Sequence, residues 1–107
     1  MNSVNVSLDE FLNQSRANPD KLMVVDFKAS WCGPCKMLTP FMNELVPNYP
    51  DVSFYVIDSD DEETEEIVEH FEVKALPTII YLKNGELVAT VIGVDKQKIE
   101  DTINDNL

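Results

Sequence analysis

The stretch that decides the fold covers residues 22–36 and reads LMVVDFKASWCGPCK. Its first six residues are apolar except for Asp26, which is the pattern of a strand that is covered on both faces. Cys32 and Cys35, the only cysteines of the chain, follow where this strand gives way to a helix. The stretch therefore predicts a buried strand at residues 22–27 that leads into a helix beginning at the cysteine pair.

The two cysteines have the spacing of a redox dithiol. Two intervening residues bring the sulfurs within bonding distance across one turn, and a helix N-terminus stabilises a thiolate through its free N–H groups. Leu38, Met42 and Leu45 recur at helical spacing and define an inward face. Cys35 falls on this face, whereas Cys32 is expected at the exposed helix start. The pattern predicts unequal roles, with one sulfur that attacks and another that resolves.

Capping signals mark three further helix starts. Ser7 and Glu10 form a capping box ahead of a short first helix. Ser59 and Glu62 form a second capping box in an acidic stretch. Asp95 can cap the last helix of the chain. Together with the helix that follows the cysteines, these signals predict four helices.

Further apolar runs complete the predicted sheet. Residues 52–57 read as a second strand, and residues 77–82 and 86–92 flank the turn Lys83-Asn84-Gly85. An Asn-Gly turn between apolar runs is a strong hairpin signal, so the last two strands are expected to be antiparallel neighbours. The order of elements predicts an α/β fold in which helices cover both faces of a mixed sheet.

Size and charge limit the classes of function. A chain of 107 residues with 44% hydrophobic residues is expected to form one domain, residues 1–107. Twenty acidic against eight basic side chains give a net charge of −12, which repels phosphate backbones and anionic lipid. Nucleic-acid and membrane roles are therefore not expected. The first residues carry neither a basic segment nor an apolar run, so we expect an unexported, cytoplasmic protein.

Metal binding is the main alternative for the cysteine pair. In a reducing compartment, a close pair indicates catalysis or metal binding rather than a structural disulfide. A tetrahedral zinc site needs four ligands, and only His70 remains among the usual nitrogen and sulfur donors. The acidic run that starts at Asp58 has Glu63 where a calcium loop needs glycine. No metal site is therefore predicted.

Several motifs far apart in the chain fit one family. They are Val25-Asp26-Phe27, Trp31-Cys32-Gly33-Pro34-Cys35-Lys36, Ala75-Leu76-Pro77-Thr78, Lys83-Asn84-Gly85 and Gly93. In this order and spacing, the chain resembles the thioredoxin family over essentially its whole length. The resemblance implies the thioredoxin fold, with a central mixed sheet of four to five strands flanked by four helices.

The resemblance also implies an activity. Cys32 would attack a substrate disulfide, and Cys35 would resolve the resulting mixed disulfide, which leaves a reduced substrate and an oxidised protein. The implied partners are disulfide-containing client proteins and an NADPH-dependent thioredoxin reductase that recharges the dithiol. No bound cofactor is implied, and we expect a monomer.

Other site residues come from the resemblance alone. Asp26 resembles a buried aspartate that moves the proton of the inward cysteine, and burial would raise its pKa. The alternative is an aspartate that faces solvent at a strand end. Pro77 resembles a cis-proline whose loop faces the dithiol; the alternative is a trans proline that opens an edge strand. The implied apolar contact surface for substrates comprises Trp31, Gly33, Pro34, Leu76, Gly93 and Val94.

Three positions depart from the family pattern. Lys28 stands where many members carry a tryptophan near the site. Phe54 falls about where bacterial members place a lysine close to the buried aspartate. Val94 follows Gly93 where a smaller residue is frequent. The packing of the site, the pKa of the buried aspartate and the shape of the substrate groove are therefore expected to differ from those of typical members.

Two other functions are compatible with the sequence. The apolar surface around the dithiol could bind a partner protein, with the dithiol incidental or regulatory. Alternatively, the protein could supply electrons to one dedicated enzyme, such as a peroxiredoxin, a ribonucleotide reductase or a methionine sulfoxide reductase.

Overall fold

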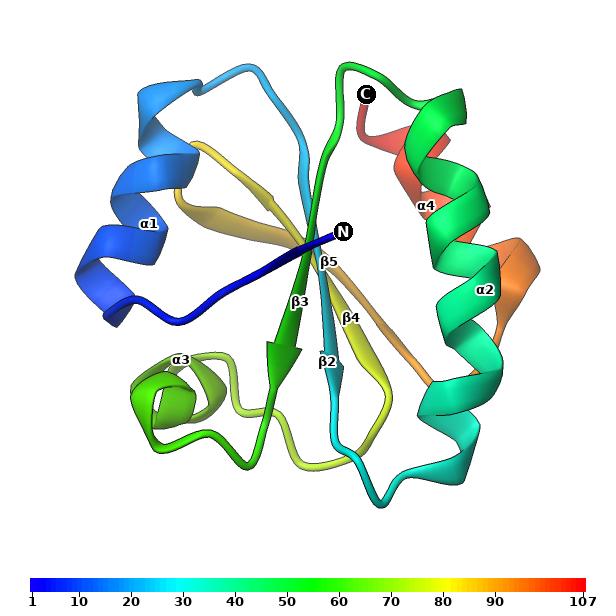
Figure 1. Cartoon of the computed structure of the whole chain (residues 1–107). Helices are drawn as coiled ribbons and strands as arrows, with labels where there is room; N and C mark the ends of the chain where they lie inside the picture. Colours follow the sequence, from blue (N-terminus) through cyan, green and yellow to red (C-terminus); the bar gives the residue numbers. More distant parts are fainter.

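The computed structural model describes residues 1–107 and contains one five-stranded sheet with the strand order β1-β3-β2-β4-β5 (Figure 1). The strands are β1 (Asn2–Ser3), β2 (Met23–Lys28), β3 (Ser53–Asp58), β4 (Thr78–Lys83) and β5 (Glu86–Ile92). β3 runs parallel to both β1 and β2, whereas β4 runs antiparallel to β2 and β5. The sheet is therefore mixed, as the order of elements predicts.

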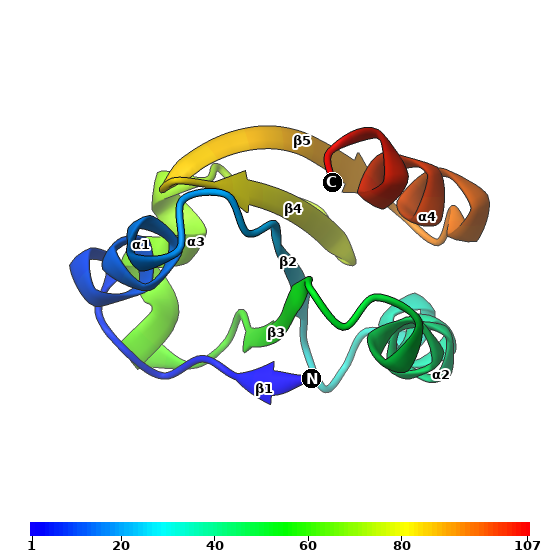
Figure 2. The ribbon, with the colours of Figure 1, turned by 90° about the horizontal axis from the view of Figure 1, so that it is seen from above.

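Four α-helices cover the sheet on both faces. They are α1 (Leu8–Ala17), α2 (Gly33–Asn48), α3 (Glu65–His70) and α4 (Lys96–Asp105), and a 3-10 turn, η1 (Glu62–Thr64), precedes α3. Figure 2 shows α1 and α3 on one side of the sheet and α2 and α4 on the other. The predicted α/β fold, with four helices around a mixed sheet, is confirmed.

Each face of the sheet has its own hydrophobic core. Twelve buried residues fill the space under α2 and α4, among them Leu38 and Ile99 from the helices and Val24 from β2. Nine buried residues fill the other side, with Phe11 from α1 and Ile67 from α3. β2 contributes to both cores because its successive side chains point to opposite faces. Its near-continuous apolar sequence is explained by this double burial.

Two of the three predicted helix caps are present. Ser7 Oγ accepts the N–H of Glu10 at 3.2 Å, and an oxygen of Asp95 accepts the N–H of Lys98 at 3.1 Å. The capping box predicted at Ser59 and Glu62 is wrong. The chain first forms the 3-10 turn, where an Asp61 oxygen accepts the N–H of Glu63 at 3.0 Å.

The helix after the cysteines continues slightly further than predicted. α2 contains both Pro40 and Pro47 and ends at Asn48, one residue beyond the proline expected to mark its end. The predicted hairpin is confirmed at Asn84 and Gly85, whose φ values of 54° and 75° are both positive, as a two-residue hairpin turn of type I′ requires. No helix in the structure has the length and apolar character needed to cross a bilayer.

Phe11 provides a test of the core beneath α1. Its ring is fully buried and makes edge-on contacts with Tyr55 and Phe71, with centroid separations of 6.4 and 6.5 Å. Phe11→Ala should lower the free energy of unfolding by about 3–5 kcal/mol, because it removes these contacts and leaves a cavity. Urea unfolding of the oxidised protein measures the change. Asn13→Ala, on the exposed side of the same helix, is the control and should change it by less than about 0.5 kcal/mol. A loss below about 1 kcal/mol for Phe11→Ala would contradict this packing.

Candidate active site

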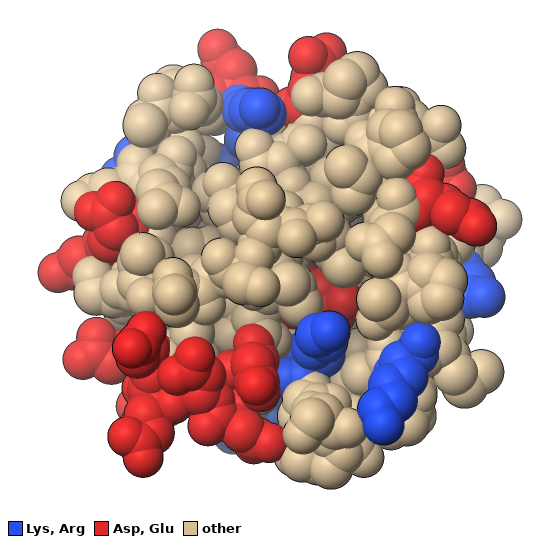
Figure 3. Space-filling view, in the orientation of Figure 1, with Lys and Arg blue, Asp and Glu red and all other residues tan.

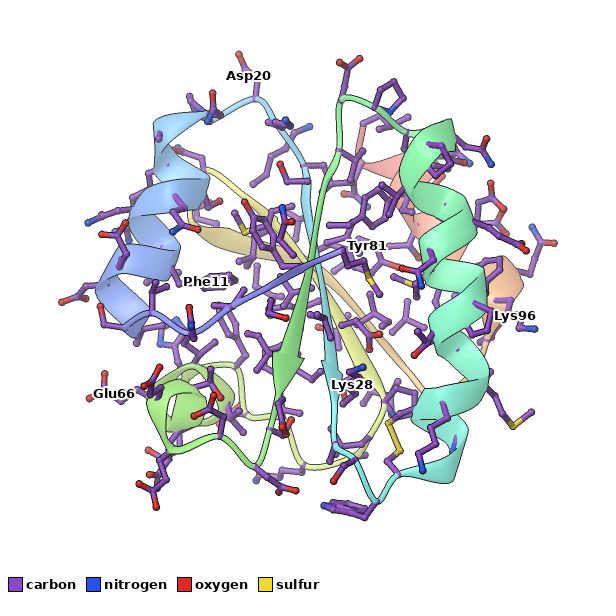
Figure 4. The ribbon with its side chains drawn as sticks, viewed as in Figure 1. Phe11, Asp20, Lys28, Glu66, Tyr81 and Lys96 are labelled. Atoms are coloured by element: carbon purple, nitrogen blue, oxygen red, sulfur yellow. A yellow bond between two sulfur atoms is a disulfide. The ribbon has the colours of Figure 1, made fainter.

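The junction of β2 and α2 holds the cysteine pair. Cys32 is the N-cap of α2 and has an extended backbone, and its Sγ accepts the N–H of Cys35 at 3.2 Å. Gly33 and Pro34 are the first two residues of the helix, and proline is well suited there because the first N–H groups have no partner within the helix. Cys32 and Cys35 form a disulfide with a Cα–Cα distance of 5.4 Å, the yellow bond of Figure 4. The structure therefore describes the oxidised protein.

The two sulfurs differ less in exposure than the sequence predicts. Cys32 is 4% exposed and Cys35 is 1% exposed, so the expectation of an exposed Cys32 is wrong for this oxidised form. The reason is packing: both cysteines cluster with buried Ala29, and Leu76 covers the cluster. What distinguishes the sulfurs is their position, because Cys32 caps the helix and Cys35 lies in its first turn.

A cis-proline loop lies against the cysteine cluster. The Leu76–Pro77 peptide bond is cis, and Thr78 Oγ1 donates to the carbonyl of Ala75 at 2.6 Å within this loop. The N–H of Gly93 donates to the Pro77 carbonyl at 2.9 Å, which joins the end of β5 to the loop. The structure thereby brings Leu76, Pro77 and Gly93 to the dithiol. The alternative of a trans proline is excluded.

Of the other predicted contact residues, Trp31 has the most distinctive surroundings. It is 69% exposed beside the cysteines, and its indole Nε1 donates to an Asp60 oxygen at 2.7 Å. Gly33 and Pro34 are exposed at the start of α2. Val94, in contrast, packs against the core under α2 and α4 and is half-buried. Sequence reasoning missed Asp60, because no local pattern links it to a tryptophan 29 residues away.

Trp31 borders a strongly acidic surface. Figure 3 shows acidic side chains gathered over the part of the molecule where α3 lies. The acidic residues of this segment are Asp58, Asp60, Asp61, Glu62, Glu63, Glu65, Glu66, Glu69 and Glu72. A molecule that approaches the dithiol past Trp31 therefore meets negative charge.

Asp26 is a fully buried carboxyl in the middle of β2, the central strand of the sheet. It is 0% exposed, and neither of its oxygens has a hydrogen-bond partner among the groups of the protein. Burial raises the pKa of Asp26 from 3.8 to about 6, and the positive charge of Lys28 opposes this shift. Asp26 lies on the same face of β2 as Val24, which packs in the core under α2. The alternative of a solvent-facing aspartate is excluded.

The strand register defines the neighbours of Asp26 across the sheet. Asp26 pairs with Val56 on β3 and with Ile79 on β4. Phe54 pairs instead with Val24 and is buried in the core under α2 and α4. Val56 therefore lies directly across from Asp26 on β3, and Phe54 lies two residues before it on the same face of the strand. The expectation that an apolar side chain here changes the pKa of Asp26 relative to typical members stays a prediction.

A cavity of about 240 Å³ opens beside the inner cysteine. Its lining includes Lys28, Cys35, Lys36, Thr39 and Asp58. Lys28 is half-buried at the end of β2, where the resemblance led us to expect altered packing. The cavity gives the otherwise buried Cys35 a polar, positively charged neighbourhood.

The disulfide lies at the start of α2 under the cis-proline loop, where its sulfurs can exchange with those of another protein. The class of protein that such a site defines is a protein-disulfide oxidoreductase. The thioredoxin family model matches residues 2–105. Similar proteins include the thioredoxin of the king cobra Ophiophagus hannah, 45% identical over 96 residues and 90% of each chain, and human thioredoxin, 45% identical over 80% of each chain.

Solved structures agree with this match. Fasciola hepatica thioredoxin superimposes with a TM-score of 0.90 at 31% identity, over 100% of both chains. Oxidised mitochondrial thioredoxin 3 of Saccharomyces cerevisiae gives a TM-score of 0.87 at 38% identity, over 98% of this chain and 94% of the yeast chain. The chain belongs to the thioredoxin family.

The buried carboxyl of Asp26 should destabilise the fold at neutral pH. Because its pKa is about 6 in the folded protein and near 3.8 in the unfolded chain, the folded state holds the proton more tightly. The free energy of unfolding should therefore fall as the pH rises from 3.8 through 6, and the loss should reach about 3 kcal/mol above pH 7.

Asp26→Leu tests this cost. The substitution replaces the carboxyl with an apolar side chain of similar size, so it should stabilise the oxidised protein by about 2–3 kcal/mol at pH 8. At pH 4 the gain should be much smaller, because the wild-type carboxyl is then protonated. Urea unfolding at the two pH values measures both gains. A gain that does not depend on pH would mean that the carboxyl titrates alike in the folded and unfolded states.

Proposed function

We propose that this protein reduces the disulfides of other proteins through a mixed disulfide on Cys32. The Cys32 thiolate attacks one sulfur of a client disulfide, and the other client sulfur leaves as a thiolate that takes a proton from water. Cys35 then loses its proton and attacks the sulfur of Cys32, which releases the second client thiol. The client gains two electrons, and the protein is left with the Cys32–Cys35 disulfide. The observation that carries this proposal is that disulfide itself, at the N-terminus of α2.

The attacking role of Cys32 is supported by its place in the helix. The N-cap sulfur lies where the free N–H groups and the positive end of the helix dipole favour a negative charge. The N–H of Cys35 already donates to this sulfur in the oxidised form. The same donor would stabilise the Cys32 thiolate after reduction.

Asp26 is proposed as the proton acceptor for Cys35. A carboxyl whose pKa is about 6 is partly ionised near neutral pH and can both accept and release a proton. Asp26 lies on the face of β2 that α2 covers, because it shares that face with Val24, and Cys35 lies on the buried side of α2. The cavity beside Cys35 offers room for water to carry the proton between them and to solvent.

Client binding is proposed for the surface around the disulfide. The backbone of Leu76, next to the cis-proline Pro77, would pair with an extended client segment in the manner of strand addition. The apolar surface for client side chains would comprise Trp31, Gly33, Pro34, Gly93 and Val94. Ile92, which is also largely exposed at the end of β5, would extend it.

The cycle needs a source of electrons. We propose an NADPH-dependent thioredoxin reductase as the partner that returns the disulfide to the dithiol, with the protein acting as a monomer in the cytoplasm. One structural neighbour, 37% identical with a TM-score of 0.88, comes from a study of the thiol resolving mechanism in a yeast mitochondrial 1-Cys peroxiredoxin via glutathione and thioredoxin systems. A thiol peroxidase of this kind is a reasonable first client to test.

Insulin reduction with dithiothreitol tests the proposal directly. The wild-type protein should accelerate insulin precipitation, and Cys32→Ser should reduce the rate to that of dithiothreitol alone, because the attacking sulfur is lost. Cys35→Ser should also fail to turn over, but it alone should accumulate a mixed disulfide visible as a mass increase on non-reducing gels. If Cys32→Ser traps insulin and Cys35→Ser does not, the two roles are reversed. If neither cysteine affects the rate, the protein is a binding module in which the dithiol is incidental.

A further inference from the structure

Lys28 is placed where its charge can act on the buried carboxyl. Residues two apart on a strand point to the same face, about 7 Å from each other, so Lys28 shares with Asp26 the face of β2 that α2 covers. Figure 4 labels Lys28 near the disulfide, toward the end of β2. Its side chain is half-buried and lines the cavity beside Cys35. Lys28 therefore lies between solvent and the site of proton transfer.

The charge on Asp26 depends on the charges around it, because no protein group forms a hydrogen bond with its oxygens. The strands that flank it offer Val56 and Ile79 as its direct partners, and neither is charged. On the same face of β4, Tyr81 is neutral, since burial raises its pKa above the ordinary tyrosine value, and its hydroxyl donates to the Ile99 carbonyl at 2.9 Å. α4 and β5 contribute apolar side chains to this core.

The remaining charged groups line the cavity. They are Asp58 at the end of β3 and Lys36 on α2, and both are exposed to solvent. Solvent screens exposed charges strongly, whereas a half-buried charge on the same strand face is screened less. Lys28 is the residue whose positive charge opposes the effect of burial on the pKa of Asp26.

We propose that Lys28 is a positioning residue for the resolving step, which keeps a fraction of Asp26 ionised so that the carboxylate can take the Cys35 proton. This inference rests on the proposed role of Asp26. The proton moves from the Cys35 thiol to the Asp26 carboxylate, and the Cys35 sulfur forms its bond to Cys32 as the client thiolate leaves. Lys28 itself exchanges no proton in this step. Without Lys28, burial alone would keep the carboxyl protonated to a higher pH, and resolution at and below about pH 6 would slow.

The first test measures the titration of Asp26 in the oxidised protein by following its carboxyl carbon in NMR spectra. Lys28→Met should raise the pKa of Asp26 by about half a unit or more, which leaves about threefold less carboxylate at pH 5 but only about one-sixth less at pH 7. Lys28→Arg keeps the charge and should restore the wild-type titration. Lys21→Met is the control, since it also removes one positive charge. Lys21 lies just before the start of β2 and does not line the cavity, so this substitution should leave the titration of Asp26 unchanged. If Lys28→Met titrates like Lys21→Met, the proposal is overturned, whatever the wild-type protein does with insulin.

The second test measures how fast a preformed mixed disulfide resolves as a function of pH. In Lys28→Met the resolution rate should rise with pH as in the wild type, but the rise should move to higher pH by the same amount as the Asp26 titration. The rate of the initial attack by Cys32 on the client, measured at a pH where the Cys32 thiolate is fully formed, should be unchanged. Lys28→Arg should follow the wild-type profile. If the Asp26 titration moves and the resolution profile does not, Lys28 has no role in resolution, and the proposed proton transfer to Asp26 also fails. Insulin reduction by the wild-type protein remains a separate test of the mixed-disulfide reaction.

Discussion

The site depends on one hydrogen bond, in which the N–H of Cys35 donates to Cys32 Sγ at 3.2 Å. This bond exists because α2 begins at the cysteine pair, so that the first sulfur takes the place usually held by a serine or aspartate oxygen at a helix N-terminus. The helix can begin there only because β2 delivers the chain to that point from the centre of the sheet. The fold thus places one sulfur at the positive end of a helix and the second sulfur one turn inside it.

The buried carboxyl of Asp26 lowers the stability of the fold but suits the proposed proton transfer. Asp26 occupies a position in the middle of the sheet where an apolar side chain would stabilise the fold. No protein group bonds its oxygens, so the protein's own groups do not offset the cost of burying them. Such a cost is typical of a functional position, where a group is kept at a pKa that suits proton transfer. Lys28 fits the same interpretation, because its positive charge reduces the upward shift in the pKa of Asp26 without forming a hydrogen bond to the carboxyl.

Local patterns were sufficient to predict most of the fold. Each of the confirmed features depends on residues that are close together in the chain. They are the strand β2 with apolar side chains on both faces, the Asn84-Gly85 turn, and the helix caps Ser7 and Asp95. The second capping box failed because Asp61 competes with Ser59 for the same helix start. Two equally plausible caps a few residues apart cannot be ranked without knowing where the chain leaves β3.

The site was less predictable where it depends on distant contacts. The cluster of Ala29 and Leu76 that buries Cys32 joins segments more than forty residues apart, which explains the wrong expectation of exposure. The pairing of Asp26 with Val56 depends on the register of two parallel strands, and the apolar sequence of β3 carries no signal for it. The cis bond before Pro77 came from family resemblance and not from any local pattern.

The most direct measurement of the central claim is the rate at which each thiol of the fully reduced protein reacts with iodoacetamide. Peptide mapping after brief exposure at pH 6.5 assigns the label to Cys32 or Cys35. Stabilisation of the thiolate at the helix N-terminus predicts that Cys32 is labelled first, at about ten times the rate of Cys35 or more. Equal rates at the two positions, or faster labelling of Cys35, would contradict the account.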